Sequence, residues 1–364
     1  MPSGSEAPLT ETTAQAVRRP RPSETVDYAI LKKQIQELGL LKAKPAYYAM
    51  KTVIALACLA LAGVIAIMSD NPWILMADAV FLGFASTQTA LLAHDIGHRQ
   101  GYRGRRTNRV ARAIAGNLLL CVSHSWWNDK HNQHHATPNH MDTDPDIQFS
   151  MLVFDARQIA QRHRMMKPLI AIQAFTLLLL LPFQGLNMRI ISFQHLWSPK
   201  AEKPWWQGAL FAAHIATYGV LLYFVGWPWA VPFVILHQAT FGLYNSSVFA
   251  SNHKGMPVVA EGEEQDFLRD QVLTSRDVLG HKAMDFWYGG LNYQIEHHLF
   301  PTMPRCNLRK AQPIIEKFCV ERGIAYHWTG LFESYKEVLV HLHRESASLR
   351  GGPAPASPAS PASS

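Results

Sequence analysis

Four long apolar stretches dominate the pattern of hydrophobic and polar positions along the chain. They cover residues 47–68, 73–93, 208–225 and 229–250, and each approaches the length of about 20 residues that a helix needs to cross a bilayer. Short connections, residues 69–72 and 226–228, join them in pairs. The pattern predicts two hairpins of transmembrane helices, and Lys51 and Asp78 are the charged interruptions in the first one.

Two further apolar stretches are too short or too polar to cross. Residues 168–185 contain Gln173, Pro182 and Gln184, and residues 110–122 carry Arg112. Helices of this kind lie in the membrane interface. The two hairpins therefore account for all four predicted crossings. Each hairpin crosses the membrane twice, so the chain enters and leaves it on the same side.

The distribution of Lys and Arg predicts the orientation of the hairpins. Both hairpin turns lack these residues, and the positive-inside rule therefore places the opposite, basic side and both termini in the cytoplasm. The net charge of +7 fits loops that face anionic headgroups, and no nucleic-acid-binding motif accompanies it. The basic flanks contain Arg18, Arg19, Lys32, Lys33, Lys42, Lys44, Arg99, Arg103, Arg105 and Arg106.

The two ends of the chain have compositions typical of disordered segments. Residues 1–25 are rich in Pro, Ser, Thr and Glu, and residues 346–364 are rich in Gly, Pro, Ala and Ser. Residues 26–345 then form one domain. The expected fold class is an all-α integral membrane protein with four transmembrane helices, interfacial helices and a cytoplasmic helical cap that holds a two-metal site.

Three clusters of histidine stand out among the 18 histidines of the chain. Residues three or four apart share a face of an α-helix, so each cluster can direct its imidazoles at one point. Gln294 occupies such a position in the third cluster, where its amide is a poor metal ligand but a good hydrogen-bonding group. The seven candidate ligands are His94 and His98, then His131, His134 and His135, then His297 and His298.

The number and type of these ligands predict a pair of metal ions. A structural zinc ion takes four ligands, and seven exceed that number. Imidazole without thiolate suits iron, copper, nickel or zinc, and among these only the redox metals activate dioxygen. The residues alone therefore narrow the choice of metal without fixing it.

Charged residues near the clusters have two interpretations each. Asp95 and Glu296, inside clusters, are expected to accept a ring N–H from a ligating histidine and so to fix its tautomer. For Asp142 and Asp144, this role and a solvated charge are equally good interpretations. Four arginines beyond the first cluster either bind the phosphates of CoA or of a phospholipid headgroup, or only fix the topology: Arg99, Arg103, Arg105 and Arg106.

The clusters resemble the three histidine boxes of the membrane fatty acid desaturase superfamily. The motifs that carry the resemblance are His94-Asp-Ile-Gly-His98, His131-Asn-Gln-His134-His135 and Gln294-Ile-Glu-His297-His298-Leu-Phe-Pro301. Their order and spacing within residues 47–327 fit the superfamily. Gln294 in place of the first histidine of the third box resembles the front-end branch and a group of bacterial acyl-CoA or acyl-lipid desaturases.

The resemblance implies a non-haem di-iron centre with dioxygen as co-substrate. It makes the seven histidines iron ligands and adds an eighth, His253, just after the last membrane helix. Some relatives hold a metal-bound water with an Asn one helical turn before that histidine, but this chain has Phe249 there. Gln294 either binds iron or holds such a water.

The implied reaction is the insertion of a cis double bond into a fatty acyl chain, an oxygen-dependent oxidation in lipid metabolism. The two electrons are expected from a separate ferredoxin or flavin-containing reductase, because the His-Pro-Gly-Gly motif of a fused cytochrome b5 domain is absent. The other expected partners are the bilayer and an acyl-CoA or acyl-lipid substrate, with no nucleic acid. The composition of the tail suggests a bacterial plasma membrane.

Two rival classes share some of these features. A related di-iron hydroxylase or ketolase uses the same boxes with a different placement of the substrate, although the third box and Leu299-Phe300-Pro301 favour desaturation. A metal transporter predicts ligands within the crossings, whereas nearly all the clustered histidines lie outside the apolar stretches.

Overall fold

The computed structural model describes residues 26–263 and 266–353. The expected disordered segment 1–25 and residues 354–364 of the C-terminal one lie outside this part of the chain. Within it the protein is helical, apart from the short parallel pairing of β1 (Asp277–Val278) with β2 (Trp328–Thr329) and one isolated bridge. The expectation of an all-α fold is confirmed.

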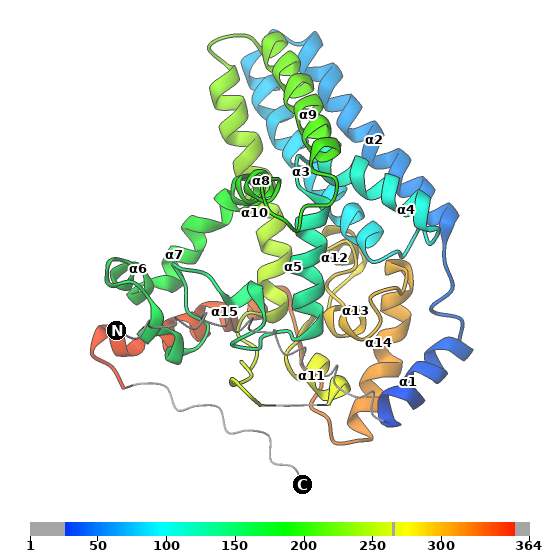
Figure 1. Cartoon of the computed structure of the whole chain (residues 1–364), viewed down its shortest axis with the longest axis vertical. Helices are drawn as coiled ribbons and strands as arrows, with labels where there is room; N and C mark the ends of the chain where they lie inside the picture. Colours follow the sequence, from blue (N-terminus) through cyan, green and yellow to red (C-terminus); the bar gives the residue numbers. More distant parts are fainter. Residues whose placement is uncertain (1–25, 264–265, 354–364) are drawn as a thin grey trace, which may run out of the picture.

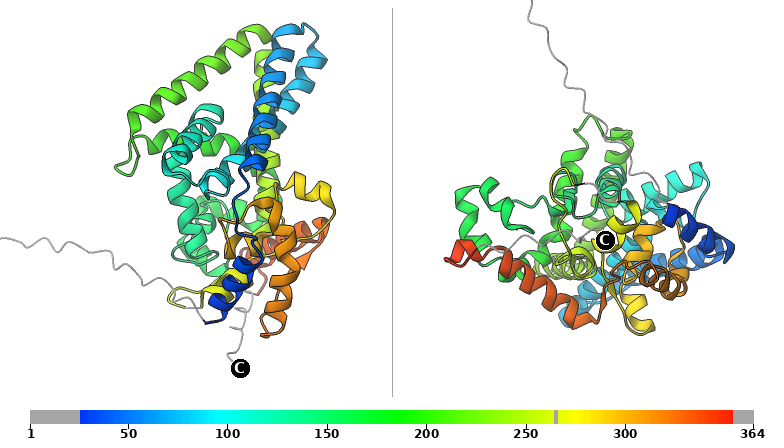
Figure 2. Two further views of the ribbon diagram at one scale, coloured as in Figure 1. Left: turned by 90° about the vertical axis from the view of Figure 1, so that its right-hand side faces the viewer. Right: turned by 90° about the horizontal axis from the view of Figure 1, so that it is seen from below.

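Two helical hairpins form one end of the molecule, and a cap of shorter helices forms the other (Figures 1 and 2). The hairpin turns lie together at the end that is remote from the cap (Figure 1). The hairpin helices are α2 (Pro45–Met68), α3 (Pro72–Gly97), α9 (Pro204–Val225) and α10 (Ala230–His253).

The first hairpin shows how the sequence produces this arrangement. Asn71 ends the turn, and its Oδ1 accepts a hydrogen bond of 2.9 Å from the backbone N–H of Trp73, which starts α3. Helix α2 buries mainly small residues, Ala55, Ala62 and Ala66, while its larger apolar side chains are exposed. Small residues allow close packing of helices where lipid provides no hydrophobic drive between them. The exposed apolar face therefore suits a bilayer.

Among the residues that the structure describes, four helices are long and apolar enough to cross a membrane, and three of them carry the expected stretches 47–68, 73–93 and 208–225. The fourth is Gln173–His195, rather than α10 with the expected stretch 229–250. Helix α10 is less apolar because it packs between other helices and buries polar groups such as His237 and Asn245. His237, for example, lies 2.8 Å from the hydroxyl of Tyr218 on α9.

The segment Gln173–His195 is divided into α7 (Gln173–Leu180), a 3-10 turn η5 (Leu181–Phe183) and α8 (Gln184–His195). Helix α8 is seen almost end-on in Figure 1, across the direction of the hairpins. The stretch 168–185, expected not to cross, thus lies mostly in a segment that is long and apolar enough to cross, and its place in the membrane interface stays a prediction. Residues 110–122 likewise form no long helix, because α4 passes into a π-helical segment, η1.

The other helical elements lie around the cap and beside the hairpins (Figure 1). Helices α1, α11, α13 and α14 share one apolar core, to which Leu31, Leu299 and Ile315 contribute fully buried side chains. Ser346 is also buried, so the folded chain continues beyond residue 345, where the tail was expected to begin.

The remaining helical elements have these bounds: α1 (Val26–Glu37), α4 (Arg105–Arg112), η1 (Ala113–Leu119), α5 (His124–Ala136), η2 (Pro145–Ile147), η3 (Ala156–Gln161), η4 (Arg164–Met166), α6 (Lys167–Ala171), α11 (Phe267–Leu273), α12 (Lys282–Trp287), α13 (Gln294–Leu299), α14 (Arg305–Val320), α15 (Leu331–Glu345) and η6 (Ala347–Arg350).

Gly242 lets α10 approach the turn between α7 and α8. A Cβ atom at this position would lie 2.0 Å from the backbone oxygen of Pro182. Backbone atoms cannot move aside as the tip of a flexible side chain can. Gly242→Ala should therefore lower the free energy of unfolding by about 1–3 kcal/mol or more. Thermal unfolding in detergent measures this effect. Gly63→Ala is the matched control, because nothing lies within 4 Å of its new Cβ, and an equal loss in both variants would contradict the close-packing explanation.

Candidate metal centre

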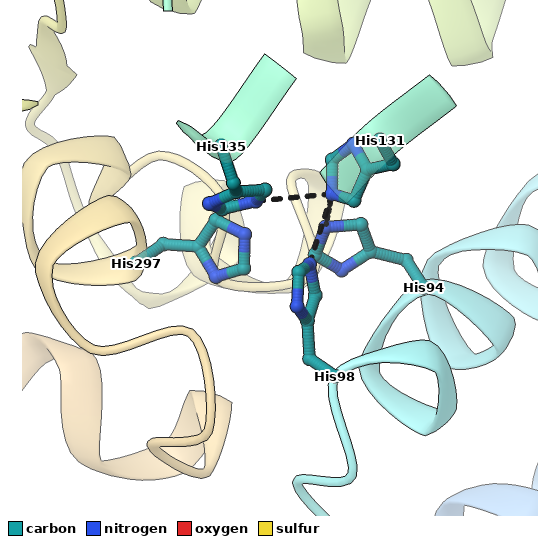
Figure 3. A group of neighbouring side chains, drawn as sticks. All are labelled: His94, His98, His131, His135 and His297. Carbon is teal, nitrogen blue, oxygen red and sulfur yellow. Dashed lines mark hydrogen bonds between the residues drawn. The ribbon is translucent and has the colours of Figure 1, made fainter. Parts of the chain in front are cut away.

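Five histidines from three helices converge on one point, and we call them the five-histidine group (Figure 3). His94 and His98 lie at the end of α3, His131 and His135 on α5, and His297 on α13. One ring nitrogen from each lies within 4.8 Å of all the others. The Nε2 atom of His131 is 3.2 Å from that of His94, 2.9 Å from that of His98 and 3.1 Å from that of His135.

Three other histidines form a second group beside the first, the three-histidine group. It consists of His134, His253 and His298, all buried. The Nε2 atom of His253 lies 3.3 Å from that of His134 and 3.0 Å from that of His298. Helices α5 and α13 serve both groups, because consecutive residues point in different directions around a helix. The rings of His135 and His298 stack with centroids 4.1 Å apart, so the two groups are neighbours.

The hydrogen bonds of the three-histidine group show which nitrogen atoms face the centre. The Nδ1 atom of His253 lies 3.0 Å from the backbone oxygen of Thr274, which can only accept, so this nitrogen carries the proton. Nδ1 of His134 lies 3.0 Å from Asp144 in the same way. Burial lowers the pKa of His253 and His298 well below the usual range of an imidazole, so both rings are neutral. Nδ1 of His298 donates to Oε1 of Gln271 at 2.9 Å, so the Nε2 atoms of His253 and His298 present lone pairs to each other at 3.0 Å. A cation between them removes this repulsion, which fits a metal ion.

The five-histidine group has the same character. Both ring nitrogens of His297 and Nδ1 of His135 are buried without a hydrogen-bond partner among the described residues. Burial lowers the pKa of His131, His135 and His297 well below the usual range of an imidazole, so these rings are neutral. Buried, neutral and unpaired imidazoles are suitable ligands for a transition metal. Adjoining sets of five and three imidazoles fit two metal ions.

Gln294 lies at the edge of the three-histidine group, but its oxygen points away from it. The amide nitrogen of Asn252 donates to the backbone oxygen of Leu291 at 3.0 Å and to Oε1 of Gln294 at 2.9 Å. The amide nitrogen of Gln294 is therefore the atom that faces His253, 2.8 Å from its Nε2. An amide nitrogen donates hydrogen bonds and does not bind metals, so this geometry argues against Gln294 as a direct metal ligand.

Two aspartates lie against ring nitrogens of the groups. Asp95 has an oxygen 3.3 Å from Nδ1 of His94, and its other oxygen pairs with Arg305 and accepts a 3.0 Å hydrogen bond from Tyr48. Asp144, fully buried, contacts Nδ1 of His134. Asp142, by contrast, is exposed.

Glu296 does not occupy the expected position against a ligating histidine. One of its oxygens accepts a 2.7 Å hydrogen bond from Tyr326, whose hydroxyl also lies 2.6 Å from Asp277. Burial raises the pKa of Glu296 well above its usual range and that of Asp277 to about 6. Glu296 is thus a neutral carboxyl group. Its position in α13 directs it toward Tyr326 and away from the helix faces that carry His297 and His298.

Replacing Asp144 or Glu296 by its isosteric amide should affect metal affinity differently. Asp144→Asn removes the charge that holds the Nδ1 proton of His134 in place, and it should lower metal affinity by about 10–100-fold. Glu296→Gln retains a neutral partner for Tyr326 and should leave metal affinity unchanged. The measurement is a competitive chelator titration of the purified protein. A large loss of affinity in Glu296→Gln would restore the role that the sequence suggested.

A mostly apolar cavity of about 190 Å³, the main cavity, adjoins both groups. Its polar lining includes His131, His134 and His253, and its apolar lining includes Leu177 and Leu180. A smaller side cavity reaches His94 from the hairpin end and is lined by Ala90 and Phe241 among others. Four residues line both cavities and so separate them: Trp127, Met188, Asn245 and Phe249.

Trp127 is a site residue that the histidine pattern alone did not identify. Its ring stacks on His131 with centroids 4.3 Å apart. It stands four residues before His131, so the spacing rule that joined the histidines could also have found it. Phe249, one turn before His253, lies with its ring centroid 6.3 Å from that of His94. Both aromatic side chains therefore lie between the five-histidine group and the two cavities that they line.

The four arginines beyond the first cluster are not brought together. Arg99 lines a polar cavity that reaches His98 of the five-histidine group, and Arg112 and Lys200 line the same cavity. Arg103 instead donates to the backbone oxygen of Leu41, and Arg105 and Arg106 are exposed at the start of α4. Arg112, from the predicted interfacial stretch, reaches both the polar cavity and the side cavity.

Comparisons with known proteins show which family the chain is similar to. A sequence model of the fatty acid desaturase family matches residues 71–330. The Delta(6)-fatty-acid desaturase of Caenorhabditis elegans is 29% identical over 86% of this chain and 73% of its own length. The acyl-lipid (9-3)-desaturase of Physcomitrium patens is 30% identical over 89% of this chain and 63% of its own length. The Delta(8)-fatty-acid desaturase of Borago officinalis is 27% identical, with 85% and 72% covered.

Proposed function

The chain belongs to the fatty acid desaturase family, and from this premise we propose that it inserts a cis double bond into a fatty acyl chain with two iron ions, dioxygen and two electrons. One observation carries the proposal: a group of five histidines and a fully buried group of three adjoin each other and open onto a mostly apolar cavity. Oxidation of an unactivated methylene pair requires a strong oxidant in a dry site, and the cofactor supplies that chemistry.

The side chains of this chain hold and shield the centre. The five-histidine group would bind one iron ion and the three-histidine group the other, with His253 as the eighth ligand. Asp144 and the backbone oxygen of Thr274 fix the tautomers of His134 and His253, which keeps the Nε2 lone pairs directed at the metal. Gln294 would donate a hydrogen bond to a metal-bound water.

The main and side cavities are the proposed path of the acyl chain. Their walls are largely apolar, and His131 and His94 lie in the walls beside the residues that separate the cavities. A chain threaded past Trp127 and Phe249 would present one pair of methylenes to the centre, and the position of that pair would decide where the double bond forms. Acyl-CoA and acyl-lipid substrates both fit this arrangement.

The electrons would come from a separate ferredoxin or flavin-containing reductase. The described cap carries several exposed cations, for example Lys282, Lys310 and Lys317. A positive surface speeds the approach of an acidic redox protein. Such a donor would dock on the cap, because the hairpin end is expected to lie in the bilayer.

We place the protein in a membrane with both termini in the cytoplasm. The lack of Lys and Arg at both hairpin turns and the cations of the opposite side support this orientation. The matched relatives named above are eukaryotic, so they lend no support to a bacterial plasma membrane.

The positions of the ligands argue against a metal transporter. Within the described residues, candidate groups of three or more metal-binding side chains occur only in the cap and at the cap ends of α3 and α10. A transport pathway would need ligands along the crossings. A di-iron hydroxylase or ketolase would use the same groups, and its products would identify it.

Product analysis tests the proposal. The chain is expressed with iron in a desaturase-deficient host, and acyl chains are analysed by mass spectrometry, with double bonds located by adduct fragmentation. A new cis-unsaturated acyl chain that is absent with His297→Ala is the expected result. A hydroxylated product would instead indicate the hydroxylase, and identical lipids in both strains would refute desaturation.

A further inference from the structure

Two lysines lie in the wall of the main cavity, where an apolar lining would be expected. Lys130 directly precedes His131 on α5, and Lys254 directly follows His253 at the end of α10. Each lysine is therefore adjacent to a member of one histidine group. Both side chains are half-buried, and placing an ammonium group beside apolar surface costs free energy unless the group is paired and hydrogen-bonded.

The protein satisfies these ammonium groups only in part. Lys130 forms an ion pair with a carboxylate oxygen of Asp146, and Lys254 donates a 2.7 Å hydrogen bond to the backbone oxygen of the same residue. Lys254 also lies 4.3 Å from the ring centroid of Phe154. An ammonium group has three N–H donors, so each lysine retains donors for a group within the cavity.

The surrounding charges indicate which group these donors would take. Asp146 and Asp144 are the carboxylates beside the lysines, and both oxygens of Asp144 are already engaged by His134 and by backbone N–H groups. Two carboxylates therefore offset the two ammonium charges, while N–H donors remain free. A neutral oxygen acceptor fits this balance better than an additional anion does.

We propose that Lys130 and Lys254 bind the carbonyl oxygen of the acyl ester or thioester. This site rests on the proposed desaturation, since it assigns the polar end of the acyl substrate to the lysine side of the main cavity. The hydrocarbon chain then runs past His131 and Trp127 toward the side cavity. Both lysines line the same cavity as His131, His134 and His253, so a carbonyl bound by them lies in the cavity that adjoins both histidine groups.

Binding of matched ligands tests the site without turnover. Palmitoyl-CoA is compared with its S-hexadecyl thioether, which lacks only the carbonyl oxygen, and diester phosphatidylcholine is compared with the diether lipid. Dissociation constants are measured on purified protein by tryptophan fluorescence. If the carbonyl ligand of one carrier, CoA or phosphatidylcholine, binds more tightly than its own ether analogue, that carrier is the source of the acyl group.

Lys130→Met and Lys254→Met keep the aliphatic stem and remove the donors. Each should weaken binding of the carbonyl ligand by about 10-fold or more, as expected for a hydrogen bond to a charged group, and should change binding of the ether form by less than about 2-fold. Lys130→Met alone leaves the carboxylate of Asp146 without its ion-pair partner. A double variant, Lys130→Met with Asp146→Asn, removes this charge as well and should bind both ligands as Lys130→Met does. Lys200→Met, in the polar cavity, should match the unmodified protein.

Equal binding of carbonyl and ether ligands by the unmodified protein would overturn the site, as would equal losses for both ligands in the lysine variants. If these results accompanied new unsaturated lipids in the host, the lysine site would fall and the proposed function would stand. If neither unsaturated lipids nor acyl binding were found, the proposed function itself would fall.

Discussion

Replacing His131 by alanine should abolish formation of unsaturated acyl chains. Its Nε2 atom lies within 3.2 Å of three other Nε2 atoms, so this ring is at the centre of the five-histidine group. Loss of a residue that only supports a ligand costs about 10–100-fold in affinity or activity, and loss of the ligand itself should exceed about 100-fold. The measurement is product formation per chain, together with iron content of the purified protein.

His343→Ala is the matched control for this variant. His343 is exposed on α15 and lies outside both histidine groups, so its loss should change neither product nor iron content. His253→Ala tests the three-histidine group in the same assay and should also abolish the product. Full iron content and activity in His131→Ala would show that the clustered histidines are not the metal ligands.

Filling the main cavity should stop the reaction while leaving the metal in place. Ala250 on α10 lines this cavity between Phe249 and Ser251. A tryptophan at this position adds a volume that a cavity of about 190 Å³ cannot accept together with an acyl chain. Ala250→Trp should therefore reduce product from long acyl chains by at least about 10-fold, since close packing allows little relaxation.

Ala216→Trp provides the matched control, because Ala216 is exposed on the apolar surface of α9. It should retain product formation and iron content. Iron content of Ala250→Trp should also match the unmodified protein, which separates a blocked cavity from a collapsed centre. Undiminished product from Ala250→Trp would mean that the acyl chain takes another path.

Local spacing explains why so much of the site was predictable. His94 and His98, or His131 and His135, share a helix face whatever surrounds them, so their convergence follows from sequence alone. The division into two groups does not. His134 and His135 are neighbours in the chain but join different groups, because α5 packs between α3 on one side and α10 on the other. His253 entered through the resemblance to a family and not through any local pattern.

The differences from expectation also have tertiary causes. Glu296 lies within a histidine cluster, but its side chain points to Tyr326 and Asp277, and sequence proximity alone could not reveal that direction. Helix α10 buries polar side chains among its neighbours, so its hydropathy is lower than that of a helix exposed to lipid. Lys130 and Lys254 are distant in sequence and share one cavity only because α5 meets the end of α10.

The central claim is that the two histidine groups form one centre with two iron ions. The most direct test is the iron content of the purified full chain after anaerobic reconstitution with ferrous iron and removal of loosely bound metal. We predict two iron ions per chain, and loss of bound iron in both His131→Ala and His253→Ala but not in His343→Ala. A single iron ion per chain at saturation, or iron binding that survives both substitutions, would contradict the account.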